Sequence, residues 1–530
     1  MSTDRRDFLR LATATLAGAT KPATQASSPS PNLEGSAVYN VRAYGATGDG
    51  HTIDSRAINS AVDAASAAGG GTIHFPAGTY ASYSIRLKSN ITLYLDNGAT
   101  ILAAGIPLEG TTNGYDPAEP QGPWEPYQDY GHNHWHNSLI WGENLHGIAI
   151  VGPGLIWGKG LSRGHENDTD LPGTTKPGAG NKAIALKNCR NVLLRDFSVL
   201  QGGWFALLAT GVDNLTIDNL KIDTNRDGLD IDCCKNVRVS NCTVNSPWDD
   251  GICPKSSFAL GHARATENLT ISNCYVTGDY QPGTVLDGTW QRFGPEFRSR
   301  ATGRIKFGTE SNGGFKNITI ANCVFESCRG LALETVDGAQ CEDITITNIA
   351  MRDIRNSPFF LRLGTRMRGP QEAQPGTLKR VLISNVVSYG AAQLPSILSG
   401  VPDHLIEDIK LSDIYLHQIG GASPEMATTR PPEKENAYPE PEMFGALPSA
   451  GFYLRHIRNL ELSNIEIATQ TPDSRPAFHL ADVHASDFFR IKVPQTRSPI
   501  FRLQNVTGFR VYGSRQLPDT TIDNAASRDL

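Results

Sequence analysis

The chain has 530 residues, 39% of them hydrophobic and 19% charged, so it is long enough for several domains or for one extended repeat domain. A net charge of -6 and a pI near 6.1 exclude the basic surface that non-specific nucleic-acid binding requires. The nine cysteines are an odd number without zinc-site spacing, which favours buried thiols over a disulfide framework or a zinc centre.

Residues 1–34 predict an export signal and a linker rather than folded structure. Arg5 and Arg6 resemble the twin-arginine export motif, and the apolar run 11–19 is too short to span a bilayer. No later window is long and apolar enough for a membrane helix. We therefore expect a protein that is soluble after export, in the periplasm or outside the cell.

A helix is predicted next, capped by Asp54 or Ser55, with Ile58, Val62 and Ala65 on its apolar face. Glycines end it at residues 69–71. Repeat domains need their terminal coil covered, because an open end exposes the core and the strand edges. We expect this helix to serve as that cap.

A long polar and aromatic loop follows and contains His132, His134 and His136. The alternating histidines allow a metal site, but no carboxylate or further histidine is placed beside them by spacing. The histidines and tryptophans of this loop fit a sugar-binding surface better. We assign neither a metal nor a cofactor.

From residue 191 onward one short phrase recurs, as in NLTIDNLKI (214–222), NVRVSNCTV (236–244) and NLTISNCYV (268–276). Each has an alternating strand, a bend centred on Asn or Asp, and a second strand. The internal period of 2 excludes helices, and the basic spacing of 22–23 residues is too short for propeller blades. The pattern predicts an all-β, right-handed parallel β-helix.

This β-helix is expected to span residues 35–515, with a C-terminal tail at 516–530. Longer intervals between phrases mark insertions, which we expect to be loops that wall a groove rather than separate domains. The expected insertions are 103–137, 161–181, 278–303 and the proline-rich 419–449.

Aligning the phrases places Asp227 and Asp249 eight residues after Asn219 and Asn241, in one slot of neighbouring coils, with Asp250 beside them. Strands in adjacent coils lie about 4.8 Å apart, so these carboxylates must crowd and at least one pKa must rise. A proton donor beside ionised carboxylates is what glycoside hydrolysis uses.

The same count places Trp204 one coil earlier, where a sugar ring can stack. An aspartate ladder on a solvated or calcium-binding face is the alternative, and Asp230 and Asp232 fit that alternative better than Asp227 does.

The motifs resemble those of glycoside hydrolase family 28, the polygalacturonases and rhamnogalacturonases. The resemblance rests on the NxDG element at 225–228, the DDGI element at 249–252, and the segments YGATGDG and GGGTIHFPAGTY. It implies Asp249 as general acid, and Asp227 with Asp250 as the groups that activate water, in an inverting mechanism without metal. Asn225 belongs to the first element and is counted with the substrate-binding residues.

Two further elements of that family are missing. Gly303 or Arg304 stands where the family has His, and Ala332 and Glu334 stand where it has Arg and Lys. A negative Glu334 would repel a uronate at the cleavage subsite, so the resemblance favours a rhamnose-containing or neutral-sugar linkage. The remaining candidate substrate-binding residues are Lys255, Arg304, Lys306, Glu310 and Arg362.

The sequence thus predicts an exported, monomeric glycosidase that acts on plant pectic polysaccharide, with exo action preferred because the insertions can block one end of the groove. Two alternatives stay open. One is a polysaccharide lyase on the same fold, and the other is a non-catalytic carbohydrate-binding β-helix.

Overall fold

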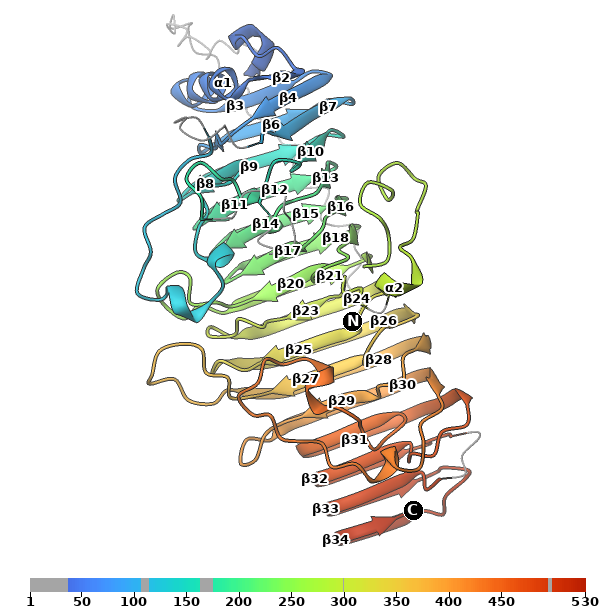
Figure 1. Cartoon of the computed structure of the whole chain (residues 1–530). Helices are drawn as coiled ribbons and strands as arrows, with labels where there is room; N and C mark the ends of the chain where they lie inside the picture. Colours follow the sequence, from blue (N-terminus) through green and yellow to red (C-terminus); the bar gives the residue numbers. More distant parts are fainter. Residues whose placement is uncertain (1–36, 106–113, 163–174, 299, 494–497) are drawn as a thin grey trace, which may run out of the picture. The chain divides into compact units, whose positions relative to one another are not determined.

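Three short parallel strands make one coil of the structure, and each strand pairs with its counterpart in the next coil (Figure 1). One coil consists of β15 (Asp213–Asp218), β16 (Lys221–Asp223) and β17 (Asp227–Asp232), and the next of β18 (Lys235–Ser240), β19 (Thr243–Asn245) and β20 (Ile252–Lys255). The predicted phrases correspond to the first two strands of a coil. The candidate aspartates lie on the third strand, which begins at Asp227 in β17, or in the turn just before it, which contains Asp249 and Asp250 ahead of β20.

The computed structural model describes residues 37–105, 114–162, 175–298, 300–493 and 498–530. The expected export signal and linker at 1–34 lie outside these residues, and residues 38–530 form the unit described below. No helix in the described ranges is long and apolar enough to cross a membrane.

The remaining strands before the insertion at 278–303 are β1 (Val38–Asn40), β2 (Asp49–Ile53), β3 (Gly71–Phe75), β4 (Gly78–Ser82), β5 (Ile85–Arg86), β6 (Ile91–Leu95), β7 (Ala99–Ala103), β8 (Ile140–Glu143), β9 (His146–Val151), β10 (Leu155–Trp157), β11 (Lys182–Lys187), β12 (Arg190–Arg195), β13 (Ser198–Leu200), β14 (Phe205–Thr210), β21 (Thr266–Ser272) and β22 (Tyr275–Thr277). Four of the later strands are short: β23 (Lys306–Phe307), β25 (Leu331–Thr335), β27 (Phe359–Leu363) and β29 (Ser396–Ser399). The others are longer, and β24 pairs with both β21 and β22: β24 (Phe315–Glu326), β26 (Gln340–Arg352), β28 (Thr377–Ala391), β30 (Ile406–Gly420), β31 (Phe452–Thr471), β32 (Phe478–Phe489), β33 (Phe501–Tyr512) and β34 (Thr520–Asp529). The helices are α1 (Ser55–Ala67), α2 (Pro295–Arg298) and the short 3-10 turns η2 (Val41–Tyr44), η3 (Glu125–Tyr127), η4 (Tyr130–His132), η5 (Met426–Thr428) and η6 (Pro441–Phe444).

The bends of successive coils are built from asparagines in the left-handed conformation. Asn219, Asn241 and Asn273 have φ of 54°, 59° and 56°. Asn tolerates this region better than other residues with a Cβ. Their side chains also bond along the stack, since Asn273 Nδ2 donates to Asn241 Oδ1 at 3.3 Å. The predicted parallel β-helix with stacked polar bends is confirmed.

All nine cysteines are buried free thiols, as the sequence favoured. Cys242, Cys274 and Cys323 lie in successive coils, and burial raises the pKa of Cys234 and Cys341 above the ordinary thiol range. They pack as small apolar side chains of the core.

The two ends of the stack are covered differently. Helix α1 buries Ile58, Ala61, Val62 and Ala65 against the first coil, as predicted, although the Asp54 side chain bonds to the amides of 47 and 48 instead of capping the helix. The segment 516–530, expected as a tail, contains β34, which is antiparallel to β33 and covers the last strand edge. Covering that edge removes a surface open to intermolecular pairing.

Candidate active site

The strand register brings Asp227 opposite Asp250. The pairs between β17 and β20 are offset by 23 residues, as in Leu229 with Ile252, whereas those between β16 and β19 are offset by 22. One extra residue therefore enters the turn before β20. The expectation that Asp227 and Asp249 occupy matching positions of neighbouring coils is therefore wrong by one residue. A count from Asn241 could not detect the extra residue, because it lies after the repeated phrase.

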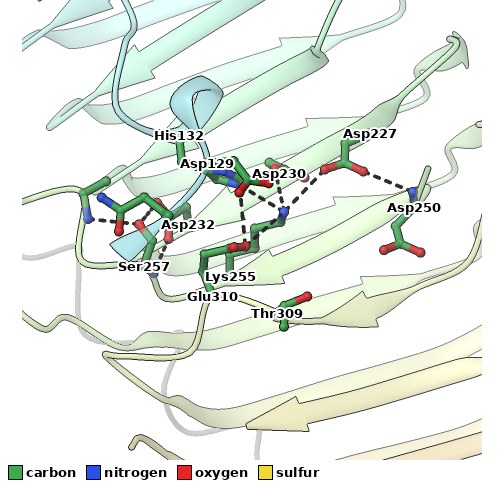
Figure 2. A network of polar contacts seen from close by, with 12 residues as sticks. Asp129, His132, Asp227, Asp230, Asp232, Asp250, Lys255, Ser257, Thr309 and Glu310 are labelled. Atoms are coloured by element: carbon green, nitrogen blue, oxygen red, sulfur yellow. Dashed lines mark hydrogen bonds and ion pairs between the residues drawn. The ribbon is translucent and has the colours of Figure 1, made fainter. Parts of the chain in front are cut away.

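Both Asp227 and Asp249 nevertheless converge on one point, the backbone amide of Asp250. Its nitrogen lies 3.1 Å from Oδ1 of Asp227 and 3.1 Å from Oδ1 of Asp249 (Figure 2 shows the first contact). Asp227 and Asp250 are buried, and the Asp249 side chain is 29% exposed. The three aspartates therefore form one cluster, reached from solvent through Asp249.

Asp227 is the carboxyl of the cluster that favours the protonated form. Burial raises its pKa well above the ordinary range, and the charges of Asp249 and Asp230 raise it further. Lys255 opposes them, with Nζ 3.4 Å from Asp227 Oδ2, without reversing the shift.

Asp249 is held ionised by a residue that sequence reasoning missed. Burial by itself would raise the pKa of Asp249, but Arg226 outweighs it and the pKa lies below its ordinary value. Arg226 donates to Asp249 Oδ2 from Nε at 3.1 Å and from Nη2 at 2.9 Å. Its guanidinium also lies over the Trp204 ring, 4.5 Å from the centroid. Trp204 is thus next to the cluster, as predicted, but is covered on this face by Arg226.

Asp250 is ionised as well, between two cations. Arg304 Nε donates to Oδ1 at 2.8 Å, and Lys306 Nζ lies 3.2 Å from Oδ2. Burial acts to raise the Asp250 pKa, but these two cations outweigh it and the pKa is lowered. Arg304 and Lys306 therefore belong to the cluster as partners of the Asp250 carboxylate.

Lys255 links the cluster to a deeper charged network (Figure 2). Its ammonium lies 3.3 Å from Asp230, 3.5 Å from Glu310 and 3.0 Å from Nε2 of His132. Glu310 has a pKa well below its ordinary value, because Lys255 and His132 outweigh the effect of burial. Lys255 and Glu310 are predicted site residues that support Asp227 from within the protein.

Asp230 and Asp232 do not form a solvated ladder, because both are fully buried. Asp230 faces Lys255 and His132, and Asp232 accepts hydrogen bonds from the amide and hydroxyl of Ser257, each at 2.7 Å. Asp230 and Asp232 therefore have structural contacts inside the protein, next to the cluster of Asp227, Asp249 and Asp250.

Glu334 does not present a negative charge to a substrate. It is fully buried, and burial raises its pKa to about 8, although Lys306 and Arg304 lie 3.6 and 4.0 Å away. A protonated, covered Glu334 cannot repel a uronate. The electrostatic reason for expecting a rhamnose-containing or neutral-sugar linkage is therefore absent.

Arg362 and Asn225 have structural contacts. Arg362 is 1% exposed and donates to the carbonyl oxygens of Gly400, Glu433 and Lys434, so it anchors the insertion at 419–449. Asn225 is buried in the turn before β17, where its carbonyl oxygen accepts a hydrogen bond from the Trp248 amide.

The insertions contribute residues that no repeat phrase could predict. From 419–449, Glu440 pairs with Arg304, and the Tyr438 hydroxyl lies 3.1 Å from Lys306 Nζ. The apolar residues Phe444 and Leu447 of the same insertion pack on outward-facing side chains of β25, β27, β29 and β31. The insertion therefore covers the sheet on the C-terminal side of the aspartates.

The loop before β8 covers the other side. Trp135 packs with Phe205 and Leu208 of β14, and His132 reaches the Lys255 network.

The parts 106–113 and 163–174 of the expected insertions lie outside the described residues. Trp248 packs against Phe293 and Phe297 of the insertion at 278–303.

Among the described residues, three groups bring possible metal ligands within 4.8 Å of one another. They are Glu119 with His136 and Glu143, Asp129 with His132 and Glu310, and Asp227 with Asp250 and Cys253. In each group a lysine ammonium already lies beside a carboxylate. Lys187 lies beside Glu143 in the first group and Lys255 beside Glu310 in the second. In the third, Lys255 lies beside Asp227 and Lys306 beside Asp250. We assign no metal to these groups.

Two family models match parts of the chain: "Rhamnogalacturonase A/epimerase, pectate lyase-like" over residues 38–112 and "Right handed beta helix region" over residues 173–291. The second agrees with the observed coils and gives their hand.

Three similar proteins are informative. The chain is 22% identical over 459 residues to a probable polygalacturonase from Vitis vinifera, which covers 80% of this chain and 84% of the relative. It is 28% identical over 220 residues to an exo-poly-alpha-D-galacturonosidase from Dickeya chrysanthemi, covering 41% of this chain and 33% of that one. The crystal structure of an exopolygalacturonase from Thermotoga maritima has a TM-score of 0.58 at 18% identity, covering 92% and 94% of the two chains. That structural likeness shows the shared β-helix fold.

Proposed function

Since the chain belongs to glycoside hydrolase family 28, the polygalacturonase family, and hydrolyses O-glycosyl bonds, we propose that it removes galacturonate residues from the end of a pectic chain. The observation that carries the proposal is the cluster of Asp227, Asp249 and Asp250 around one backbone amide. Asp227 favours the protonated form and Asp249 and Asp250 the ionised form, so the cluster holds a proton beside two carboxylates.

In the proposed reaction Asp249 protonates the leaving oxygen, because it is the most exposed of the three carboxyls and can meet a sugar. Asp227 and Asp250 hold and deprotonate the attacking water. Water as the nucleophile makes the reaction inverting. The roles of the three residues follow the motif resemblance, and their proximity supports them.

Exo action is supported by what covers the sheet on either side of the aspartates. The insertion at 419–449 packs over β25, β27, β29 and β31, and the loop with His132 and Trp135 covers β14. A long polymer lying along the coils would have to displace both segments. Cleavage at a chain end does not require the polymer to extend past both segments.

Export by the twin-arginine route remains part of the proposal, supported by the Arg5–Arg6 motif. A fusion of residues 1–34 to a reporter that is active only after twin-arginine export tests it. Substituting both arginines by lysine should then abolish the reporter signal.

The activity is tested by incubating the purified protein with homogalacturonan, rhamnogalacturonan and debranched oligomers of each. The proposal predicts monogalacturonate as the first product, with the anomeric configuration inverted in NMR spectra taken during the first turnovers. Unsaturated products detected by absorbance would identify a lyase instead. Binding without any released sugar would identify a non-catalytic carbohydrate-binding protein.

A further inference from the structure

Arg226 occupies a position in the cluster to which the motif resemblance assigns no role. Trp204, Arg226 and Asp249 lie at matching positions of three successive coils, because β14 pairs with β17 at an offset of 22 and β17 with β20 at 23. The guanidinium is therefore held between an indole ring and a carboxylate, with its Nε and Nη2 both directed at Asp249 Oδ2.

This arrangement conflicts with the role of Asp249 in the free protein. A general acid must carry a proton, but a carboxylate that accepts two hydrogen bonds from a guanidinium is held ionised. The neighbouring Asp227 favours the protonated form, and it shares the Asp250 amide with Asp249. In the free protein the proton needed for catalysis is thus on Asp227, whereas the group that must deliver it is the neighbouring Asp249.

We propose that Arg226 is a positioning residue which exchanges Asp249 for the carboxylate of a bound uronate and thereby allows the proton to move from Asp227 to Asp249. The inference rests on the proposed function and deepens it. In this proposal the negative charge of the substrate is what allows Asp249 to become protonated and act as the acid.

The proton balance closes over one turnover. In the free protein Asp227 is protonated and Asp249 is ionised and paired with Arg226. When the uronate takes Arg226, the proton crosses to Asp249, which then gives it to the leaving oxygen as the glycosidic bond breaks. Water attacks the anomeric carbon and loses a proton to Asp227. This restores the initial state, and the sum is hydrolysis.

Access and chemistry favour Arg226 over the other cations of the site. Its side chain is 14% exposed, against 8% for Lys255, 3% for Lys306 and 1% for Arg304. The planar guanidinium fork matches a carboxylate with two parallel hydrogen bonds. Trp204 supports the guanidinium from behind, so it can change partner without losing its place.

The test compares an oligogalacturonide with its methyl ester on wild-type protein, Arg226→Gln and Arg226→Lys. In wild type the free acid should have a kcat roughly tenfold to a hundredfold above the ester, the factor expected for one charge-assisted hydrogen-bonded pair. In Arg226→Gln the acid loses its guanidinium partner, and the ester no longer meets an Asp249 that a guanidinium holds ionised, so the ratio of the two kcat values approaches one. Arg226→Lys restores part of the preference.

The pH profile gives a readout that a purely structural role would not move. Without Arg226 the Asp227–Asp249 pair keeps its proton to higher pH, so the alkaline limb of kcat/KM should move upward in Arg226→Gln. The matched control is Arg380→Gln, an exposed arginine that pairs with Asp343 in a later coil, and it should change none of these values. Unchanged circular dichroism melts confirm that the variants are folded.

Two outcomes overturn the inference. One is an equal loss of kcat on acid and ester in Arg226→Gln with an unmoved pH profile. The other, which needs no turnover, is equal affinity of wild type and Arg226→Gln for galacturonate; the inference expects at least tenfold weaker binding by the variant. If wild type binds galacturonate through Arg226 but hydrolyses none of the oligomers, it is the proposed hydrolase activity that fails.

Discussion

Arg226 and Asp249 form a two-bond ion pair beside a second carboxyl, that of Asp227, which is buried and favours its protonated form. Two aspartates that bond to the same amide thus have pKa values shifted in opposite directions, and Asp249 accepts two hydrogen bonds from the Arg226 guanidinium. Such separation of pKa values within one cluster is how a site provides an acid and a base at one pH. It also predicts how each carboxylate responds to substitution.

Asp227→Asn should leave stability nearly unchanged, because the neutral amide replaces a carboxyl whose raised pKa favours the protonated form. We expect the free energy of unfolding near neutral pH to stay within about 1 kcal/mol of wild type. The same change should lower kcat by about 10²- to 10⁴-fold, since the base is lost. Urea unfolding and initial rates on an oligogalacturonide measure both quantities.

Glu310→Gln is the matched comparison, because Glu310 is ionised and faces Lys255 inside the protein. Removing one partner of a buried pair leaves charge uncompensated, so we expect a loss of roughly 3 kcal/mol. Equal stability losses for Asp227→Asn and Glu310→Gln would contradict the assigned protonation states.

Glu334 should make the protein less stable as pH rises. Its pKa is raised from 4.5 to about 8 in the folded protein, first of all by burial. Between these values the unfolded chain releases the proton and the folded protein keeps it, so the unfolded state gains stability with increasing pH. The destabilisation caused by Glu334 is absent below about pH 4.5 and reaches its full size above about pH 8.

Glu334→Gln should remove this slope. The variant should match wild type near about pH 5 and exceed it by on the order of a few kcal/mol near about pH 8, as urea midpoints at the two values would show. A difference that is the same at both pH values would mean that Glu334 is ionised when folded, and that Lys306 and Arg304 offset its burial.

The asparagine bends make a separate prediction about stability. Asn268 has φ of 58°, donates to Asn236 at 3.1 Å and accepts from Asn317 at 2.7 Å. Asn268→Ala should cost about 2–3 kcal/mol, from the strained backbone and the broken ladder. Asn268→Gly should cost only the ladder, about 1 kcal/mol, because glycine adopts this φ freely. Equal losses in the two variants would show that the backbone conformation is unimportant.

The coils could be predicted from the sequence because the alternating strands and asparagine bends are local features that are repeated many times. It was insufficient for the register at Asp227, since one extra residue between Asn245 and Ile252 shifts the pairing and follows no template. The state of Glu334 also escaped prediction, because its neighbours Arg304 and Lys306 contact Glu440 and Tyr438 of an insertion that is remote in sequence.

Arg226 was overlooked for a different reason. It lies inside the NxDG element, at the position the motif leaves unspecified, so pattern matching passed over it. Its alignment with Trp204 and Asp249 could have been read from the repeat, but only with the correct register. Tyr438 and Glu440 had no signal in the repeat, because contacts between an insertion and a coil have no periodicity.

The most direct measurement is the turnover and binding of Asp249→Asn on an oligogalacturonide, with Asp343→Asn as control, an aspartate that also pairs with an arginine but in a distant coil. We predict that Asp249→Asn loses at least about 10²-fold in kcat, as expected for a missing general acid, while binding is retained and the control is unaffected. An Asp249→Asn protein that hydrolyses the oligomer at the wild-type rate would contradict the assignment of this cluster as the hydrolytic centre.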